Sequence, residues 1–286
     1  YSESEKPGDG TVEIKKEVIF EEDFEGTSHS FKLITDQYAA NEYWEKDTST
    51  VNTNASDHVY GVGSGEKDTG TQFTTPLGIN ENVTVAFDLK MDACAGGKSS
   101  SYALLGGKCS TNWISGDQQI LTIVGSSTAN GYWNTITVNG QDITAAANVN
   151  NGTANGESSG KGGLNRDTTG WLRVVAELDF SAQTIGLTMT RISDGSQVYS
   201  GDVNFVNNVT SLENIFMAGA KAYGGVFTDN IEIYTEKEVQ VPPTGGGNEP
   251  GVTTYVYKDT GLAPVTAYSY KVAAIVDGKT SFMSRP

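Results

Sequence analysis

The chain has 286 residues and a formal net charge of −16 at pH 7, because 35 aspartate and glutamate residues outnumber 19 lysine and arginine residues. A negative field of this strength repels phosphate backbones, so nucleic-acid binding is not expected. No stretch of the sequence is long and apolar enough to span a membrane. Short runs rich in valine, isoleucine, tyrosine and phenylalanine are separated by glycine, asparagine, serine and threonine, and this layout predicts an all-β protein.

The N-terminal residues 1–16 are polar and charged, and they are interpreted as a leader or interdomain tail. The next segment, EVIFEEDFEG, alternates so that Asp23 and Glu25 share one face of an extended strand with a third carboxylate. Residues 31–64 are irregular and rich in tyrosine and tryptophan. They predict long loops with one or two short strands.

Four runs in the middle of the chain predict strands: 71–79, 82–93, 101–107 and 118–126. The second of them alternates between apolar and polar residues. The loop between the last two runs carries Trp113. A hairpin is predicted in residues 132–144, where Asn139 and Gly140 suit the positive φ angles of a tight turn. Residues 145–166 contain almost nothing apolar and predict a long loop.

The clearest predicted structure lies in residues 170–201, which read as three consecutive antiparallel strands. In the first two strands apolar residues take every second position: Leu172, Val174, Ala176, Leu178, Phe180, Ile185, Leu187 and Met189. Tight turns are predicted at residues 181–183 and at Asp194-Gly195. This meander needs a second sheet to cover its apolar face.

A closing strand is predicted in residues 225–235. Its alternation is expected to turn Phe227, Ile231 and Ile233 inwards. Asp229 shares this parity, and an inward carboxylate needs a partner.

The C-terminal part of the chain reads as a linker followed by a second, smaller domain. Residues 237–251 are rich in proline and glycine and have no apolar period, as in a linker. Residues 252–286 alternate again and resemble the second half of a fibronectin type III domain. The resemblance is carried by Asp259-Thr260-Gly261-Leu262, by the Leu262, Pro264, Thr266 and Tyr268 spacing of the tyrosine corner, and by the strand 268–274. The front strands of that fold are missing, so we expect a partial immunoglobulin-like sandwich.

Residues 17–236 resemble the jelly-roll, concanavalin-like modules found beside catalytic domains in secreted bacterial polysaccharide-degrading enzymes. The resemblance rests on the opening FEEDFEG at 20–26, the strand GWLRV at 170–174 and the closing TDNIEIY at 228–234. It implies a β-sandwich of two antiparallel sheets. It also implies a structural calcium ion where the first and last strands meet, with oxygen ligands from Asp23, Glu25 and Asp229. A surface cluster of carboxylates without a metal is the alternative.

Candidate sugar-binding residues are aromatic. Proteins hold pyranose rings by stacking flat aromatic faces on them and by hydrogen bonds from polar side chains. Trp113, Tyr132 and Trp133 lie in polar, glycine-rich surroundings and are the first candidates for ligand contact. Trp44 and Tyr102 are further candidates. For each of them, packing in the protein is the alternative interpretation.

No catalytic residues are predicted. A retaining glycosidase on this fold would carry Glu-x-Asp-x-x-Glu on one strand face, but the run that starts at Glu21 has Gly26 in the last position. The two histidines lie in polar segments, and no Gly-x-Ser-x-Gly nucleophile motif is present.

Together these features predict a non-catalytic carbohydrate-binding module that targets a larger, secreted or cell-surface polysaccharide-degrading enzyme to its polysaccharide, with plant cell-wall glycan as the first expectation. The expected partners are a saccharide and the neighbouring domains of the same polypeptide. A structural or adhesive surface module is the first alternative, and a polysaccharide-cleaving enzyme is the second. The two cysteines, Cys94 and Cys109, flank a short loop and either pair as a disulfide or remain thiols.

Overall fold

The computed structural model describes residues 11–34, 42–44, 58–63, 68–91, 98–114, 116, 118–127, 133–143, 170–220, 225–241, 275–276 and 279–280. Every regular element in these ranges is a β-strand. The described part of the chain contains no helix that is long and apolar enough to cross a membrane. The chain divides into two compact units, Lys16–Glu236 and a smaller unit made of Tyr1–Lys15 and Lys237–Pro286.

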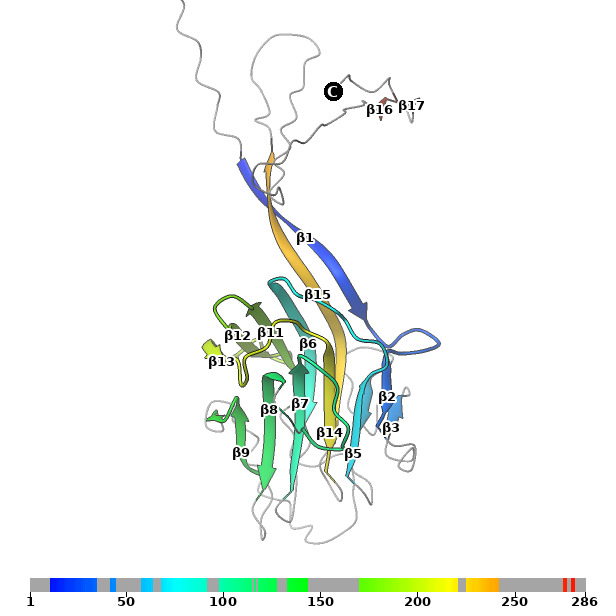
Figure 1. Ribbon diagram of the computed structural model, residues 1–286, viewed down its shortest axis with the longest axis vertical. Helices are drawn as coiled ribbons and strands as arrows, with labels where there is room; N and C mark the ends of the chain where they lie inside the picture. Colours follow the sequence, from blue (N-terminus) through cyan, green and yellow to red (C-terminus); the bar gives the residue numbers. More distant parts are fainter. Residues whose placement is uncertain are drawn as a thin grey trace, which may run out of the picture. The chain divides into compact units, whose positions relative to one another are not determined.

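The larger unit contains two antiparallel sheets (Figure 1). The eight-stranded sheet has the order β13 (Gln197–Asn204), β12 (Thr184–Arg191), β11 (Leu172–Asp179), β6 (Val83–Met91), β15 (Val226–Val241), β4 (Tyr60–Val62) and β3 (Glu42–Trp44), and β1 (Thr11–Glu22) also pairs with β15. The seven-stranded sheet has the order β10 (Gln141–Asp142), β9 (Trp133–Val138), β8 (Gln119–Ser127), β7 (Ser99–Leu105), β14 (Asn214–Gly219), β5 (Thr69–Phe73) and β2 (Phe31–Leu33). The predicted antiparallel β-sandwich, a jelly roll, is confirmed.

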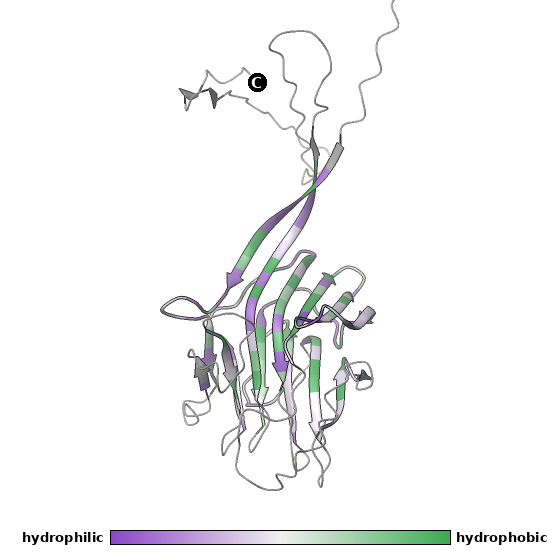
Figure 2. Cartoon of the chain, turned by 180° about the vertical axis from the view of Figure 1, so that it is seen from behind, coloured by the Kyte–Doolittle hydropathy of each residue, from purple (hydrophilic) through white to green (hydrophobic). Residues whose placement is uncertain are grey.

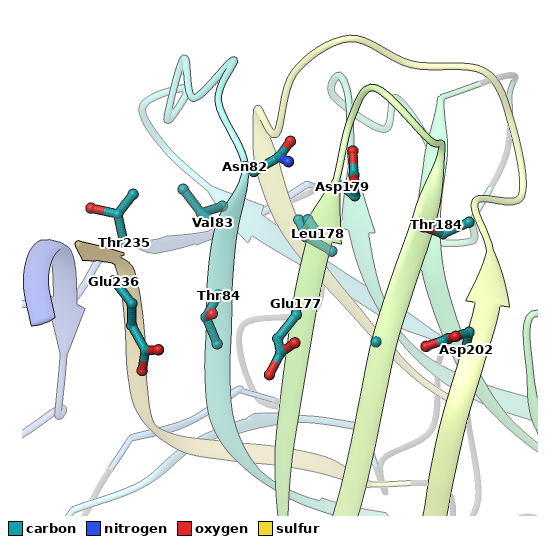
Figure 3. A pocket seen from close by; sticks show the side chains of 11 residues that line it. Asn82, Val83, Thr84, Glu177, Leu178, Asp179, Thr184, Asp202, Thr235 and Glu236 are labelled. Carbon is teal, nitrogen blue, oxygen red and sulfur yellow. The ribbon is translucent and has the colours of Figure 1, made fainter. Parts of the chain in front are cut away.

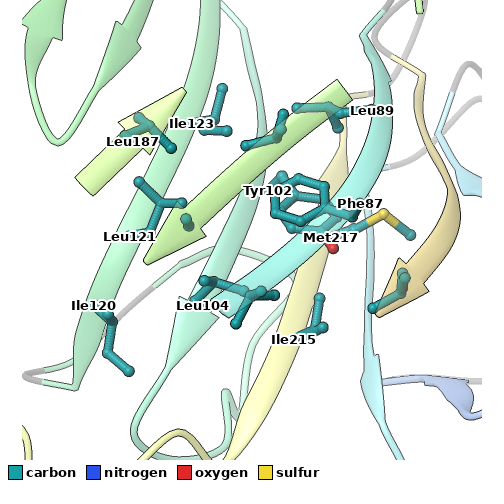
Figure 4. Packing of buried hydrophobic residues seen from close by; sticks show 14 of the residues in the cluster. Phe87, Leu89, Tyr102, Leu104, Ile120, Leu121, Ile123, Leu187, Ile215 and Met217 are labelled. Carbon is teal, nitrogen blue, oxygen red and sulfur yellow. The ribbon is translucent and has the colours of Figure 1, made fainter. Parts of the chain in front are cut away.

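The core lies between the sheets because apolar residues take alternate positions along the strands (Figure 2). Phe87 on β6 and Tyr102 on β7 stack at its centre, with ring centroids 4.2 Å apart and planes 15° from parallel (Figure 4). Both side chains are fully buried. Tyr102 was a predicted ligand contact, and that prediction is wrong because its ring faces the opposite sheet and not the solvent.

The predicted meander is confirmed residue by residue. β11 pairs with β12, and β12 pairs with β13, both antiparallel. The core-facing positions of β11 and β12 are the predicted ones, with Leu172, Val174, Leu178, Ile185 and Leu187 all buried. The Asn139-Gly140 turn also forms, and both residues have positive φ angles of 45° and 81°.

The last strand departs from its predicted alternation. The register between β15 and β6 shifts between Asp229 and Glu232, where Asn230 adopts a left-handed φ of 47°. Ile231 belongs to the main core, whereas Phe227 packs with Val59 and Trp171 in a separate cluster. The prediction that Phe227 faces inwards is therefore wrong, because a bulge reverses the face on which the residues before it lie.

The first and last strands run past the predicted boundaries at residues 17 and 236. β1 starts at Thr11 and β15 continues to Val241, although the larger compact unit itself spans Lys16–Glu236. The two strands pair with each other, and this pairing satisfies backbone groups without an apolar period. Of the fibronectin-like segment 252–286, the structure describes only the antiparallel strand pair β16 (Ile275–Val276) and β17 (Lys279–Thr280). The rest of that prediction lies outside the described residues.

Candidate ligand-binding face of the eight-stranded sheet

The predicted aromatic contacts do not gather at one place. Trp113 is half-buried against a small cluster that includes Leu105 and Phe216 of the seven-stranded sheet and the loop residue Cys109. Trp44 is half-buried as well, and its indole N–H donates to the carbonyl of Phe24 at 3.1 Å. Tyr132 and the side chain of Trp133 lie outside the described residues. The contact of these four residues with a saccharide stays a prediction.

The described residues do not assemble the predicted calcium site. The exposed Glu25 accepts hydrogen bonds from the backbone N–H of His58 at 2.9 Å, and Asp23 accepts one from the backbone N–H of Glu25 at 3.1 Å. Asp229 is fully buried and accepts from the backbone N–H of Asn230 at 2.8 Å. Among the residues that the structure describes, no group of three or more His, Cys, Asp or Glu side chains could hold a metal ion. The structure therefore does not show the predicted calcium site, and calcium binding stays a prediction.

The pairing of the two cysteines also stays open. Cys109 is buried, and the side-chain amide of Gln72 bonds to both its backbone N–H and its carbonyl, at 2.9 Å and 2.8 Å. Cys94 lies outside the described residues.

An aromatic cluster at the edge of the sandwich holds one of the two histidines. The ring of His29 lies 4.6 Å from Trp44 and 4.5 Å from Tyr60, measured between centroids. Burial lowers the pKa of His29 from its ordinary value, although the charges of Glu42 and Glu22 act in the opposite direction. The folded protein therefore holds this imidazole in its neutral form to a lower pH than the unfolded chain does.

The half-buried His29 predicts acid sensitivity. Below the ordinary histidine pKa of about 6.5, the unfolded chain binds a proton that the folded chain does not, so the free energy of unfolding should fall as the pH drops. The stability that His29 contributes is thus complete above about pH 6.5 and is lost towards its lowered folded pKa. Urea denaturation of the parent and of His29→Gln between pH 7.5 and pH 5 measures this, and the variant should show the shallower pH dependence. Equal slopes for the two proteins would contradict the prediction.

The outer face of the eight-stranded sheet carries polar residues that the strand register aligns. Because Val85, Phe87 and Leu89 point into the core, Thr84, Ala86, Asp88 and Lys90 point outwards. In the register, Thr84 lies opposite Glu177, Glu177 opposite Gly186, and Gly186 opposite Asp202. One row across four strands therefore presents a hydroxyl, a carboxylate, a glycine and a second carboxylate on the same face.

One end of this outer face is occupied by charged groups that neutralise each other. Asp88 and Asp229 lie opposite each other in the register and are both buried. The Arg173 guanidinium donates to Asp88 Oδ1 at 3.0 Å. The Asn230 side-chain N–H₂ group donates to Asp88 Oδ2 at 2.9 Å and to Asp229 Oδ2 at 3.3 Å. These contacts offset the repulsion between the two buried carboxylates. We therefore interpret this part of the face, formed by Asp88, Arg173, Asp229 and Asn230, as a structural anchor and call it the anchor end.

The other end of the outer face is hollowed into a groove of about 400 Å³ (Figure 3). We call it the β-face groove, and its lining residues come from β15, β6, β11, β12, β13 and their ends: Asn82, Val83, Thr84, Glu177, Leu178, Asp179, Thr184, Gly186, Asp202, Thr235 and Glu236. Among the described residues, the lining offers an amide, hydroxyls and carboxylates and no lysine or arginine side chain. Its volume falls in the range of about 300 to 1,000 Å³ that is usual for ligand sites.

Gly186 leaves the floor of the β-face groove without a side chain. A Cβ placed there would lie 3.3 Å from Glu177 Oε2 and 3.8 Å from Asp202 Oδ1. The two carboxylates on the neighbouring strands therefore approach the same point above the sheet. A glycine inside a strand often marks a place where another group comes close to the backbone.

Three of the four carboxylates in the β-face groove are available to a ligand. Within the described part of the chain, no hydrogen bond or ion pair engages Glu177, Asp202 or Glu236. The fourth, Asp179, is committed to its own turn. Its Oδ1 accepts from the hydroxyl of Ser181 at 2.7 Å and from the backbone N–H of Ala182 at 2.9 Å, and these bonds lower its pKa.

The solved structures that resemble this chain include distant relatives of low sequence identity. No known family matches the sequence, and no curated protein sequence matches it. Similar solved structures include the carbohydrate recognition domain of Emp47p, with a TM-score of 0.45 and 9% identity over 77% of this chain and 97% of that chain. The Lotus tetragonolobus seed lectin has a TM-score of 0.42 and 9% identity over 76% of this chain and 98% of that one. The K3 cleaved adhesin domain of Lys-gingipain from Porphyromonas gingivalis has a TM-score of 0.37 and 12% identity over 77% of this chain and 100% of that domain. With TM-scores this low, the functional argument rests on the chain's own residues.

Proposed function

We propose that the unit Lys16–Glu236 is a saccharide-binding module that uses the β-face groove. The observation that carries this proposal is a groove of about 400 Å³ whose walls are almost entirely hydrogen-bonding groups on adjacent strands. Carboxylates accept hydrogen bonds from sugar hydroxyls, while the amide of Asn82 and the hydroxyls of Thr84 and Thr184 can both donate and accept. The bare backbone at Gly186 lets a sugar ring approach the sheet.

In this proposal the module is non-catalytic and serves a larger secreted or cell-surface protein that acts on polysaccharide. The acidic net charge of −16 and the β-sandwich support this setting. The chemistry of the lining favours polyhydroxylated ligands over apolar ones, because Val83 and Leu178 are the only large apolar side chains among its described residues. A structural or adhesive module that binds protein is the competing function, and it predicts no saccharide binding at all.

Filling the β-face groove should weaken saccharide binding without unfolding the protein. Gly186 has no positive φ, so Gly186→Val is compatible with the strand, and its new side chain would displace the Glu177 and Asp202 carboxylates. We expect affinity for any saccharide ligand to fall about tenfold or more, which equals about 1.4 kcal/mol. Isothermal titration calorimetry against a panel of neutral, acidic and amino-sugar oligosaccharides measures this.

The matched control is Thr188→Val. Thr188 lies two residues along the same strand and on the same face as Gly186, but it does not line the β-face groove. This variant should bind like the parent. Retention of binding by Gly186→Val, with an unchanged melting temperature, would place the saccharide elsewhere. Binding of no member of the panel by the parent protein would remove the proposed function and favour the adhesive one.

A further inference from the structure

The charges on the outer face of the eight-stranded sheet are distributed unequally between its two ends. At the anchor end, Arg173 pairs with Asp88, and nearer the edge Lys16 pairs with Glu232 at 2.5 Å. Both of these cationic side chains are therefore already paired with a carboxylate. In the β-face groove, Glu177, Asp202 and Glu236 have no cationic partner among the described residues.

This arrangement selects the charge of the ligand. Three uncompensated carboxylates line one groove, and the net charge of −16 adds a long-range field of the same sign. A uronate or sulfated sugar would place further negative charge among these groups and would be repelled. An ammonium group has three N–H donors and carries the opposite charge, so it can bond to more than one carboxylate at a time.

The geometry over Gly186 suits a group of this size. Glu177 Oε2 and Asp202 Oδ1 lie 3.3 Å and 3.8 Å from the position that a Cβ of residue 186 would take. A small donor above Gly186 therefore lies between two carboxylates that belong to different strands. Glu236 comes from β15 on the other side of β6, so a longer oligosaccharide could meet it with its next residue.

We propose that the ligand of the β-face groove is an amino-sugar oligosaccharide with free amines, bound through its ammonium groups by Glu177 and Asp202. This inference rests on the proposed function, and it makes the ligand a de-N-acetylated hexosamine glycan. Plant cell-wall glycans, which are neutral or carry uronates, then serve as comparison ligands. Ammonium–carboxylate hydrogen bonds are about twice as strong as neutral ones, which gives the free amine its advantage over the amide.

The test compares two ligands that differ only in acetylation. Glucosamine oligomers and N-acetylglucosamine oligomers of equal length are titrated into the full chain by calorimetry at pH 6, at low and at high salt. The free-amine oligomer should bind about tenfold or more tightly than the acetylated one, and the difference should shrink at 1 M salt, where charges are screened within about 3 Å. A galacturonate oligomer of the same length should bind least.

Two double variants separate groove binding from general attraction to an acidic protein. Glu177→Gln with Asp202→Asn removes two charges from the β-face groove and should abolish the preference for the free amine. Asp194→Asn with Glu213→Gln removes the same number of charges outside the groove and should leave the preference intact. A preference that survives the first pair, or disappears equally with the second, would overturn the proposal.

The outcomes distinguish this inference from the proposed function. If both oligomers bind equally well and Gly186→Val weakens both, the groove binds saccharides but the amino-sugar assignment is wrong. If no oligosaccharide of any charge binds, the proposed function fails and the assignment fails with it. A tighter free-amine complex that only the groove variants weaken supports both.

Discussion

Replacing Tyr102 with alanine should lower the free energy of unfolding by about 3 to 5 kcal/mol. The ring is fully buried and stacks on Phe87 at 4.2 Å between the two sheets. Its removal would leave a cavity that neighbouring strands cannot close, because each is held by hydrogen bonds to two others. Urea denaturation of the parent and the variant measures the loss.

Tyr102→Phe is the matched control for this change. It keeps the stacked ring and removes only a hydroxyl, so the free energy of unfolding should change by no more than about 1 kcal/mol. Saccharide affinity should be the same for Tyr102→Phe and the parent, because the residue does not reach the surface. A stable Tyr102→Ala protein that has lost saccharide binding would restore Tyr102 as a ligand contact and contradict its assignment to the core.

The second large effect is expected at the anchor end of the outer face. Arg173→Met should lower the free energy of unfolding by about 3 kcal/mol, because it leaves Asp88 and Asp229 buried opposite each other without the guanidinium. Chemical denaturation of the parent and the variant at pH 7 provides the measurement.

Lys16→Met is the control for the loss of a positive charge. The ion pair of Lys16 with Glu232 is more exposed, with 42% and 21% of the two side chains accessible, so its loss should cost at most about 1 kcal/mol. Adding Asp88→Asn to Arg173→Met should restore stability, since it removes one of the two facing charges. Equal losses for Arg173→Met and Lys16→Met would show that the anchor is not an effectively buried ion pair.

The β-face groove could be anticipated only in part from the sequence. A hairpin that turns at residues 181–183 pairs Asp179 with Thr184, and it therefore pairs Glu177 with Gly186. The sequence alone could predict that pairing, because the position of the turn determines the register of a hairpin. Thr84 and Glu236 join the groove through pairings between strands far apart in the chain, and no local pattern predicts those.

The aromatic candidates show the limit of composition as a guide to a binding site. Trp113 sits in a polar, glycine-rich segment, yet its ring packs against Leu105 and Phe216 on the outer face of the seven-stranded sheet. Trp44 lies in an equally polar segment, yet it packs on His29. A polar loop can fold back over a sheet and bury its aromatic residue, and whether it does so depends on strands elsewhere in the chain.

By itself the sequence determined the class of the fold and its local geometry. The period of two along residues 82–93 and 170–201, with the Asn139-Gly140 and Asp194-Gly195 turns, predicted antiparallel strands whose core faces are the observed ones. Only the tertiary structure decided the rest. It placed a bulge at Asn230 that turns Phe227 and Asp229 outwards, and it buried Asp88 and Lys90 on the face that alternation marks as solvent-exposed. The physical reason is range: alternation and turn chemistry act between residues near in sequence, whereas bulges, cross-strand charge pairs and grooves depend on which distant strands become neighbours.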